Sequence, residues 1–252
     1  MRAWGVLFLV LLPAGCGGGS KQSVPKNPPP ALAQRCGEDA QGVDAKPLWF
    51  RASDGALLDG AEVGDSDVGV VLAHESPSDL CPWLPFAKTL AANGYRALAF
   101  DFRGSGASPA QFAAKATRND LDVVGAAAEL RRLGAKKVFL VGGSFGGAAV
   151  VAAAPEVDPQ PAGVISLSGE PDLLGAMQAA PRVKAPLLDL IARNDGYSSV
   201  ADNRRLVDAA ASTDKRLEVY PGDSHGWDLL YLAPYKARVN TLVFDFLREH
   251  SQ

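Results

Sequence analysis

Residues 137–151 read Lys137-Val-Phe-Leu-Val-Gly-Gly-Ser-Phe-Gly-Gly-Ala-Ala-Val-Val151. The apolar run from Val138 to Val141 predicts a buried strand, and the small residues from Gly147 to Ala154 are compatible with a helix. Between them Ser144 stands at the apex of a turn, with glycines two positions before and two after it. Glycine leaves room for the strained backbone of such a turn. A strand, a turn with Ser at its apex and a helix are the context that a nucleophilic serine in G-x-S-x-G requires.

The same pattern occurs a second time at Gly222-Asp-Ser-His-Gly226, so the pattern alone does not identify a nucleophile. Ser224 follows Pro221 and has a His inside the motif, which favours a loop. Ser144 follows an apolar strand and precedes a small-residue helix, which makes it the candidate nucleophile. The amide of Phe145 would lie at the N-terminus of that helix, where an N–H can stabilise an oxyanion.

Composition and charge limit the classes of function. The chain has 252 residues, 47% apolar and 21% charged residues, and a net charge of −3, which are ordinary values for a globular protein. Lys and Arg are scattered singly or in pairs, so we expect no nucleic-acid partner. No Gly-x-Gly-x-x-Gly follows an early strand and there is no Walker A motif, so a dinucleotide or nucleotide site is not expected.

The first residues predict export. Met1-Arg2 is basic, Trp4 to Leu12 is apolar, and Pro13-Ala-Gly-Cys16 follows. The apolar run is too short to span a membrane and is typical of a signal peptide, over residues 1–15. The segment resembles a bacterial lipoprotein signal, with Pro13 as a departure from the usual pattern. That resemblance implies lipidation of Cys16 and an anchor in the bacterial cell envelope, on the periplasmic or outer face, as the sole contact with a membrane; without lipidation the protein would be secreted.

Residues 16–35 are expected to be the lipidated Cys16 and a disordered tether, because the segment is rich in Gly, Ser, Lys and Pro. Residues 36–252 are expected to form a single domain. In an exported protein Cys36 and Cys81 are candidates for one disulfide, and the alternative is two unpaired thiols. No Cys-x-x-Cys motif or His cluster accompanies them, so we expect no metal site.

Short apolar segments alternate with amphipathic ones along the rest of the chain. Strands are expected at 48–52, 56–63, 68–73, 95–100, 138–141, 163–168, 186–192 and 216–220, and helices at 83–93, 119–133, 147–154, 200–211 and 235–250. Asn119 or Asp120 is expected to cap its helix. This alternation predicts an α/β fold, with a mostly parallel sheet, helices on both faces and an antiparallel hairpin at one edge.

A serine hydroxyl needs a base, and the base needs an acid that orients it. The chain has three histidines: His74, His225 and His250. His250 stands near the C-terminus and is expected to be a solvated tail residue. His74 and His225 both follow strands, and active-site residues of open α/β sheets gather at the carboxyl ends of strands. His225, in a Gly-flanked loop after the last strand, is the candidate base.

The acid should follow a strand between Ser144 and His225 in the chain. Asp195 comes three residues after the strand that ends at Ala192, and it is the leading candidate. Asp189 lies inside that strand, where its carboxyl group would be buried or face away from the loop. Asp202 falls at a helix start, where capping is the simpler role.

Five segments together resemble the α/β-hydrolase fold family. They are Val-Val-Leu-Ala-His74, Phe-Asp-Phe-Arg-Gly-Ser-Gly106, Gly-Gly-Ser144-Phe-Gly-Gly, Ala-Arg-Asn-Asp195 and Pro-Gly-Asp-Ser-His225-Gly226. The resemblance covers about residues 48–247, and the order Ser, Asp, His is that of the family. It implies that Ser144 is the nucleophile, His225 the general base and then acid, and Asp195 the orienting carboxylate.

The resemblance also implies an oxyanion hole made by the amides of Phe145 and Ser76. The loop of Ser76 usually begins His-Gly; here it begins His74-Glu75, and Glu75 would bring a negative charge near the site that disfavours anionic substrates. The alternative for Glu75 is a solvent-facing loop carboxylate. Residues 169–185 are too few for a cap domain, which predicts a minimal lid and an open site. Trp83, Phe86, Met177 and Trp227 are candidate walls of that site.

The function that follows is hydrolysis of a small-molecule ester through a Ser144 acyl-enzyme, with no metal or organic cofactor. The resemblance to a family rich in esterases favours a carboxylesterase. An amidase or peptidase, or a thioesterase, would use the same three residues, because a fold does not determine its substrate. A non-catalytic lipoprotein that keeps the fold to bind a ligand at the envelope is the alternative from another class.

Overall fold

The computed structural model describes residues 25, 27, 29–110, 117–232 and 234–252. The predicted signal peptide, Cys16 and most of the predicted tether therefore lie outside the described residues. Within the described ranges, no helix combines the length and the apolar character that crossing a bilayer demands.

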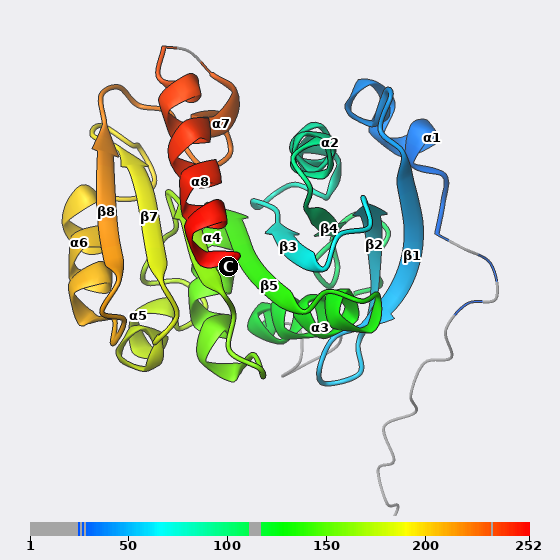
Figure 1. Cartoon of the computed structure of the whole chain (residues 1–252), viewed down its shortest axis with the longest axis horizontal. Coiled ribbons are helices and arrows are strands. Elements are labelled where there is room, and N and C mark those ends of the chain that lie inside the picture. Colours follow the sequence, from blue (N-terminus) through cyan, green and yellow to red (C-terminus); the bar gives the residue numbers. More distant parts are fainter. Residues whose placement is uncertain (1–24, 26, 28, 111–116, 233) are drawn as a thin grey trace, which may run out of the picture.

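An eight-stranded sheet runs through the centre of the molecule (Figure 1). Its spatial order is β1-β2-β4-β3-β5-β6-β7-β8. Strand β2 is antiparallel to both β1 and β4, and all the other neighbouring pairs are parallel. The strands are β1 (Ala45–Arg51), β2 (Leu57–Val63), β3 (Val68–Ala73), β4 (Arg96–Phe100), β5 (Lys137–Gly143), β6 (Gly163–Leu167), β7 (Leu187–Ala192) and β8 (Lys215–Tyr220). The predicted parallel sheet with a hairpin at its edge is confirmed.

Helices cover both faces of this sheet. The core on one face contains residues of α3, α4, α5 and α6, and the core on the other contains residues of α1, α2, α7 and α8. The helices are α1 (Leu32–Cys36), α2 (Leu84–Ala92), α3 (Asn119–Arg132), α4 (Phe145–Ala153), α5 (Ala176–Ala179), α6 (Val200–Ala209), α7 (Asp228–Tyr231) and α8 (Lys236–His250). Short 3-10 helices are η1 (Gly37–Ala40), η2 (Cys81–Trp83), η4 (Ala154–Glu156) and η5 (Ala180–Arg182).

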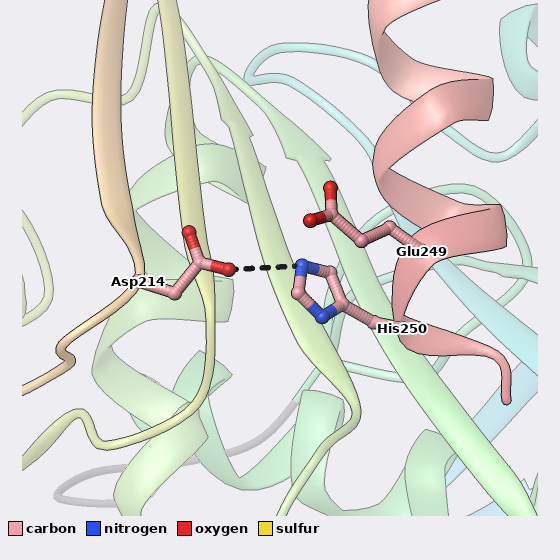
Figure 2. Close-up of side chains that lie close together, drawn as sticks. All are labelled: Asp214, Glu249 and His250. Carbon is pink, nitrogen blue, oxygen red and sulfur yellow. Dashed lines mark ion pairs between the residues drawn. The ribbon is translucent and has the colours of Figure 1, made fainter.

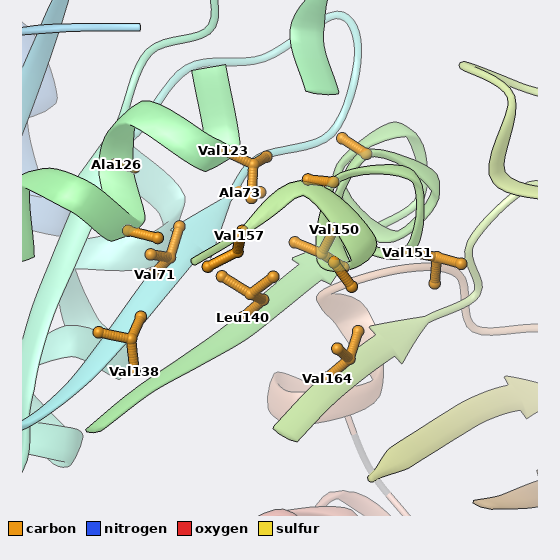
Figure 3. Packing of buried hydrophobic residues seen from close by; sticks show 14 of the residues in the cluster. Val71, Ala73, Val123, Ala126, Val138, Leu140, Val150, Val151, Val157 and Val164 are labelled. Carbon is orange, nitrogen blue, oxygen red and sulfur yellow. The ribbon is translucent and has the colours of Figure 1, made fainter. Parts of the chain in front are cut away.

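Strand β5 explains why its sequence is apolar without alternation. Val138 and Leu140 belong to the core on the α4 side, and Phe139 and Val141 belong to the core on the α8 side. Successive side chains of a strand point to opposite faces, and helices cover both faces here, so each residue needs an apolar side chain. Figure 3 shows Leu140 packed between the strands and helix α4. Because β5 is packed on both faces, the position of Ser144, the residue that follows it, is fixed.

Two helix starts differ in detail from their predictions. Helix α3 has Arg118 at its N-cap and no side-chain cap, so the expected capping by Asn119 or Asp120 is wrong. Asp120 instead binds the Arg118 guanidinium, with an Oδ2–Nη2 distance of 2.8 Å. Helix α6 is capped by Ser199, whose hydroxyl accepts a hydrogen bond from the Asp202 amide. Asp202 therefore stands inside the first turn, and its carboxylate accepts a hydrogen bond from the Ser199 hydroxyl at 2.6 Å.

The folded chain begins earlier than residue 36. Residues 32–35, assigned to the tether, are part of α1, and Leu32 is buried against the core that contains α2. Arg35 forms ion pairs with Asp59 and with Asp101, which lie on and after the sheet strands and are fully buried. Two buried carboxylates are costly unless a cation pairs with them. Arg35 supplies that cation, from the segment that was expected to be disordered.

Buried Asp189 gives a prediction on stability. Asp189 is fully buried inside β7, one of the two arrangements expected, and it pairs in register with Ser166 of β6. Burial raises its pKa to about 7, since neither carboxylate oxygen has a hydrogen-bond partner among the described residues. Between pH 4 and 7 the folded protein therefore holds a proton that the unfolded chain releases, and its contribution to the free energy of unfolding falls as pH rises.

Replacing Asp189 by Asn removes this titration. The variant should gain stability over the parent by roughly 1 kcal/mol per pH unit between pH 4 and 7. Urea unfolding of both proteins at pH 5, 6 and 7 measures the difference. Other buried carboxyls are common to both proteins, so the difference isolates Asp189; a difference that does not change with pH contradicts the assignment.

Candidate active site

Ser144 lies between the end of β5 and the start of α4, with φ 52° and ψ −118°. This is a region that residues with a Cβ rarely occupy, so the turn carries backbone strain. The flanking glycines allow it, since a Cβ on Gly146 would lie 2.1 Å from the Ala73 carbonyl oxygen and a Cβ on Gly142 would lie 2.2 Å from that of Gly146. The start of α4 thus touches the end of β3. Neither Gly142 nor Gly146 can be replaced by a larger residue without a steric clash.

The Ser144 side chain faces a carboxylate that sequence reasoning missed. Its hydroxyl donates a hydrogen bond to Oε1 of Glu170, at 3.4 Å. Its backbone is held by a bond from its amide to the carbonyl of Leu167 in β6, at 2.9 Å. Phe145 is the first residue of α4, so its N–H has no acceptor within the helix.

Asp195 and His225 are in direct contact, although 30 residues separate them. Nδ1 of His225 lies 2.9 Å from each carboxylate oxygen of Asp195. A carboxylate only accepts, so Nδ1 carries the proton and donates, and the unprotonated Nε2 is left able to accept one. The amides of Tyr197 and Ser198 donate to Oδ1 of Asp195, at 2.9 and 3.0 Å, and hold the carboxylate in place.

This arrangement sets the charges of the pair. Burial alone would raise the pKa of Asp195, but the hydrogen bonds from His225 and from two backbone amides lower it below its ordinary value. Burial alone would lower the pKa of His225, but the bond to Asp195 and the charges of Asp195, Glu75 and Glu170 raise it above its ordinary value. The site is therefore built to favour the protonated imidazole once a proton arrives.

The predicted residues lie at one edge of the sheet. Ser144 follows β5, Asp195 follows β7 and His225 follows β8, and all three strands run parallel. The loop of His225 reaches the turn of Ser144, because a Cβ on Gly143 would lie 3.1 Å from the amide nitrogen of Trp227. Ser76 is exposed in the loop after β3, the strand next to β5.

Of the two roles expected for Glu75, the solvent-facing carboxylate is wrong, and the charge near the candidate site agrees with its contact to the loop of His225. Its Oε1 accepts a hydrogen bond from the Trp227 amide, at 2.7 Å, and a Cβ on Gly226 would lie 1.6 Å from that oxygen. The carboxyl group thus packs against the loop of His225, and burial raises its pKa to about 7. The sequence could not show this, because the contacts join residues about 150 positions apart.

Replacing Glu75 by Gln should lower the pKa of His225, because it removes one of the carboxylates that raise it. Gln keeps an oxygen that can accept from the Trp227 amide, so the loop is retained. NMR titration of His225 in both proteins measures the change. Glu156→Gln, which removes an exposed carboxylate beyond the far end of α4, should leave the pKa unchanged. An unchanged or higher pKa in Glu75→Gln contradicts the electrostatic role.

His74 holds a loop. It is almost fully buried; its Nε2 accepts from the Phe102 amide at 3.1 Å, so Nδ1 carries the proton and donates to the Glu75 carbonyl at 2.5 Å. Burial lowers its pKa, which keeps the ring neutral. His74 thus ties the loop after β3 to the loop after β4.

His250 is not the solvated tail residue that was expected. Its ring packs on Phe246, with centroids 4.6 Å apart, and Nε2 lies 3.3 Å from Oδ2 of Asp214 (Figure 2). With Glu249 these form a group whose potential ligand atoms lie within 4.8 Å of one another. Asp214 and Glu249 are exposed, and Asp214 precedes β8, at the opposite end of the sheet from Ser144. The contact between His250 and Asp214 joins the end of α8 to the start of β8.

Other expectations are resolved by contacts. Ser224, in the second G-x-S-x-G match, accepts a hydrogen bond from the Tyr235 hydroxyl at 2.9 Å and lies in the loop before α7. Trp83 and Phe86 are buried in the core, so they do not line an open site, contrary to expectation. Cys36 and Cys81 are joined by a disulfide that ties α1 to η2, in the loop after β3.

The rule that active-site residues gather at the carboxyl ends of the strands could have identified Glu170. The residue follows β6 by three positions, the same distance at which Asp195 follows β7. Tyr197, exposed for 77% of its surface, also escaped notice, and its ring lies 4.7 Å from that of His225.

Comparison with known proteins fits this geometry. A family model for the alpha/beta hydrolase fold matches residues 70–234, which run from β3 through the loop of His225. The chain belongs to the α/β hydrolase fold family. No curated protein matches the sequence significantly.

Solved structures of this fold resemble the chain at low identity. An esterase of Pyrococcus furiosus superposes with a TM-score of 0.71 at 18% identity, over 90% of this chain and 98% of that one. A monoacylglycerol lipase of Paleococcus ferrophilus gives 0.65 at 20%, over 77% and 99%. A malate-bound esterase of Thermogutta terrifontis gives 0.65 at 17%, over 82% and 100%. At such identities the likeness establishes the α/β hydrolase fold alone.

Proposed function

We propose that this protein is a serine hydrolase that cleaves carboxylic esters of small molecules through an acyl-enzyme on Ser144. The observation that carries the proposal is the Asp195–His225 pair, bonded at 2.9 Å, in a site where the loop of His225 reaches the strained turn of Ser144 at Gly143. Membership of the α/β hydrolase fold and the esterase and lipase names of similar structures support it.

Each residue has a stated role in the proposed reaction. The hydroxyl of Ser144 turns from Glu170 toward Nε2 of His225, gives up its proton and attacks the ester carbonyl. The raised pKa of His225 favours this transfer, and Asp195 stabilises the imidazolium. His225 then returns the proton to the leaving alcohol, and the same base activates the water that releases the acyl group.

The oxyanion of each tetrahedral intermediate is assigned to two backbone amides. One is that of Phe145, free of a helical acceptor at the start of α4. The other is that of Ser76, in the loop that His74 and Asp101 hold; the Asp101 carboxylate accepts from the Leu80 amide at 2.8 Å. Fixed donors of this kind stabilise developing charge without reorganising during the reaction.

Labelling by a fluorophosphonate probe tests the proposal. The protein without its first 28 residues should be labelled at Ser144, and Ser144→Ala should not be labelled although it folds. Ser224→Ala is the matched control and should be labelled like the parent, because Ser224 lies in a loop. A parent that is folded and unlabelled would overturn the proposal and favour a ligand-binding role; label at Ser224 would move the nucleophile.

We also propose export, with cleavage after residue 15 and lipidation of Cys16 in a bacterial envelope. The Cys36–Cys81 disulfide supports export, because disulfides persist in oxidising compartments. Metabolic labelling with a fatty-acid analogue should mark the full chain and not Cys16→Ser. Unlabelled protein recovered from the medium would show secretion instead.

A further inference from the structure

Glu170 places a carboxylate at the atom that would be acylated. Its Oε1 lies 3.4 Å from Oγ of Ser144, and its charge raises the pKa of His225. Among the described residues, no Lys or Arg forms an ion pair with Glu170 or with its neighbour Asp172. A carboxylate without a paired cation beside a nucleophile repels the oxyanion that must form there. Glu170 would therefore slow the reaction unless a positive group on the substrate compensates its charge.

The backbone that carries Glu170 is rigid. The amide of Gly169 donates to the Ser166 hydroxyl at 3.2 Å, and its carbonyl accepts from the Ser198 hydroxyl at 2.7 Å. Asn203, which is buried, donates to the same Ser198 oxygen at 2.6 Å. The loop after β6 is therefore bound to the loop that carries Asp195 and to α6. Glu170 is built into the site and does not extend freely from the surface.

A small cavity of about 90 Å³ adjoins Glu170. Its lining includes Glu170, Asp172, Tyr197 and Asp202. Asp202 is paired with Arg205, so its charge is compensated. Tyr197 offers an exposed ring beside His225. A carboxylate and an aromatic ring around a small space suit a cationic group, and the volume suits a small substituent.

We propose that Glu170 recognises a primary ammonium group on the acyl carbon next to the scissile carbonyl, so that the preferred substrates are amino-acid esters or aminoacyl amides. This inference rests on the proposed function and names its substrate class. Hydrolysis of such an ester consumes one water and yields a free amino acid and an alcohol.

The distances favour the acyl side of the substrate. In the acyl-enzyme the carbonyl carbon is bonded to Oγ of Ser144, and a nitrogen on the next carbon lies two bonds beyond it. A carboxylate oxygen 3.4 Å from Oγ is within hydrogen-bonding reach of that nitrogen. When the Ser144 hydroxyl turns from Glu170 toward His225 to attack, Glu170 loses its donor, and the substrate ammonium replaces it. The contact between Glu170 and the ammonium is therefore made only once Ser144 has turned to attack, and binding energy realised at that stage accelerates the reaction.

An isosteric pair of substrates tests the inference. Alanine methyl ester and methyl isobutyrate differ by an ammonium group in place of a methyl group. At pH 7, below the α-amino pKa of about 7.7–8.0, the amine is mostly protonated. The ammonium group also activates the ester chemically, so the ratio of the two kcat/KM values is compared between parent, Glu170→Gln and Glu156→Gln. A ratio measured within one preparation does not depend on the folded fraction.

The ratio should fall about tenfold or more in Glu170→Gln, since a charge-assisted hydrogen bond is lost, and stay unchanged in Glu156→Gln. An unchanged ratio in Glu170→Gln, including an equal loss of both activities, overturns the inference while the proposed function stands. If the parent hydrolyses neither ester and resists the fluorophosphonate, both the inference and the proposed function fail.

Discussion

Ser144→Ala and His225→Ala should each lower kcat for ester hydrolysis by roughly 10⁴- to 10⁶-fold. The double variant should have a kcat no lower than that of the less active single variant. The reason is that the two residues act as a unit: without His225 the hydroxyl keeps its proton, and without Ser144 the base has nothing to activate. The bond between His225 and Asp195 prepares the imidazole for that single task.

Initial rates on a short-chain ester, with enzyme concentration raised for the variants, measure this effect. Ser224→Ala and His74→Gln are the comparison variants. Ser224→Ala should keep parental kcat, whereas His74→Gln disturbs a buried loop contact and should lower stability along with rate. Independent, multiplicative losses in Ser144→Ala and His225→Ala would contradict a shared proton-transfer step.

Replacing both Cys36 and Cys81 by Ser should lower the free energy of unfolding by about 4 kcal/mol. The disulfide closes a loop with a sequence separation of 45, and in the chain-entropy model such a cross-link removes about that much freedom from the unfolded chain. Serine avoids the cavity that a smaller residue would leave at these two buried positions.

Urea unfolding of parent and variant, each with and without dithiothreitol, isolates the cross-link. The reductant should shift the midpoint of the parent toward that of the variant and leave the variant unmoved. Equal midpoints without reductant would mean that the bond does not form in the expressed protein. The ion pairs of Arg35 with Asp59 and Asp101 remain in the variant, so α1 should stay docked.

Local patterns in the sequence were sufficient to predict the fold family. The apolar run of β5 has no alternation because helices cover both faces of the sheet. The positions two before and two after Ser144 are glycines because the neighbouring backbone leaves no room there for a Cβ. The rule that functional residues follow parallel strands led to Asp195 and His225, and the structure places them 2.9 Å apart. Each of these signals lies within a few residues of the feature it predicts.

Tertiary structure alone decided which polar residues meet. The sequence does not distinguish the loop histidines by environment, but His74 is buried between two loops, while Nε2 of His225 remains available as an acceptor. Glu75 and Glu170 look like ordinary loop carboxylates, yet one lies under the loop of Trp227 and the other at Ser144. The physical reason is that hydrogen bonds and burial depend on residues brought together by the sheet order, and a local pattern contains no information on those neighbours.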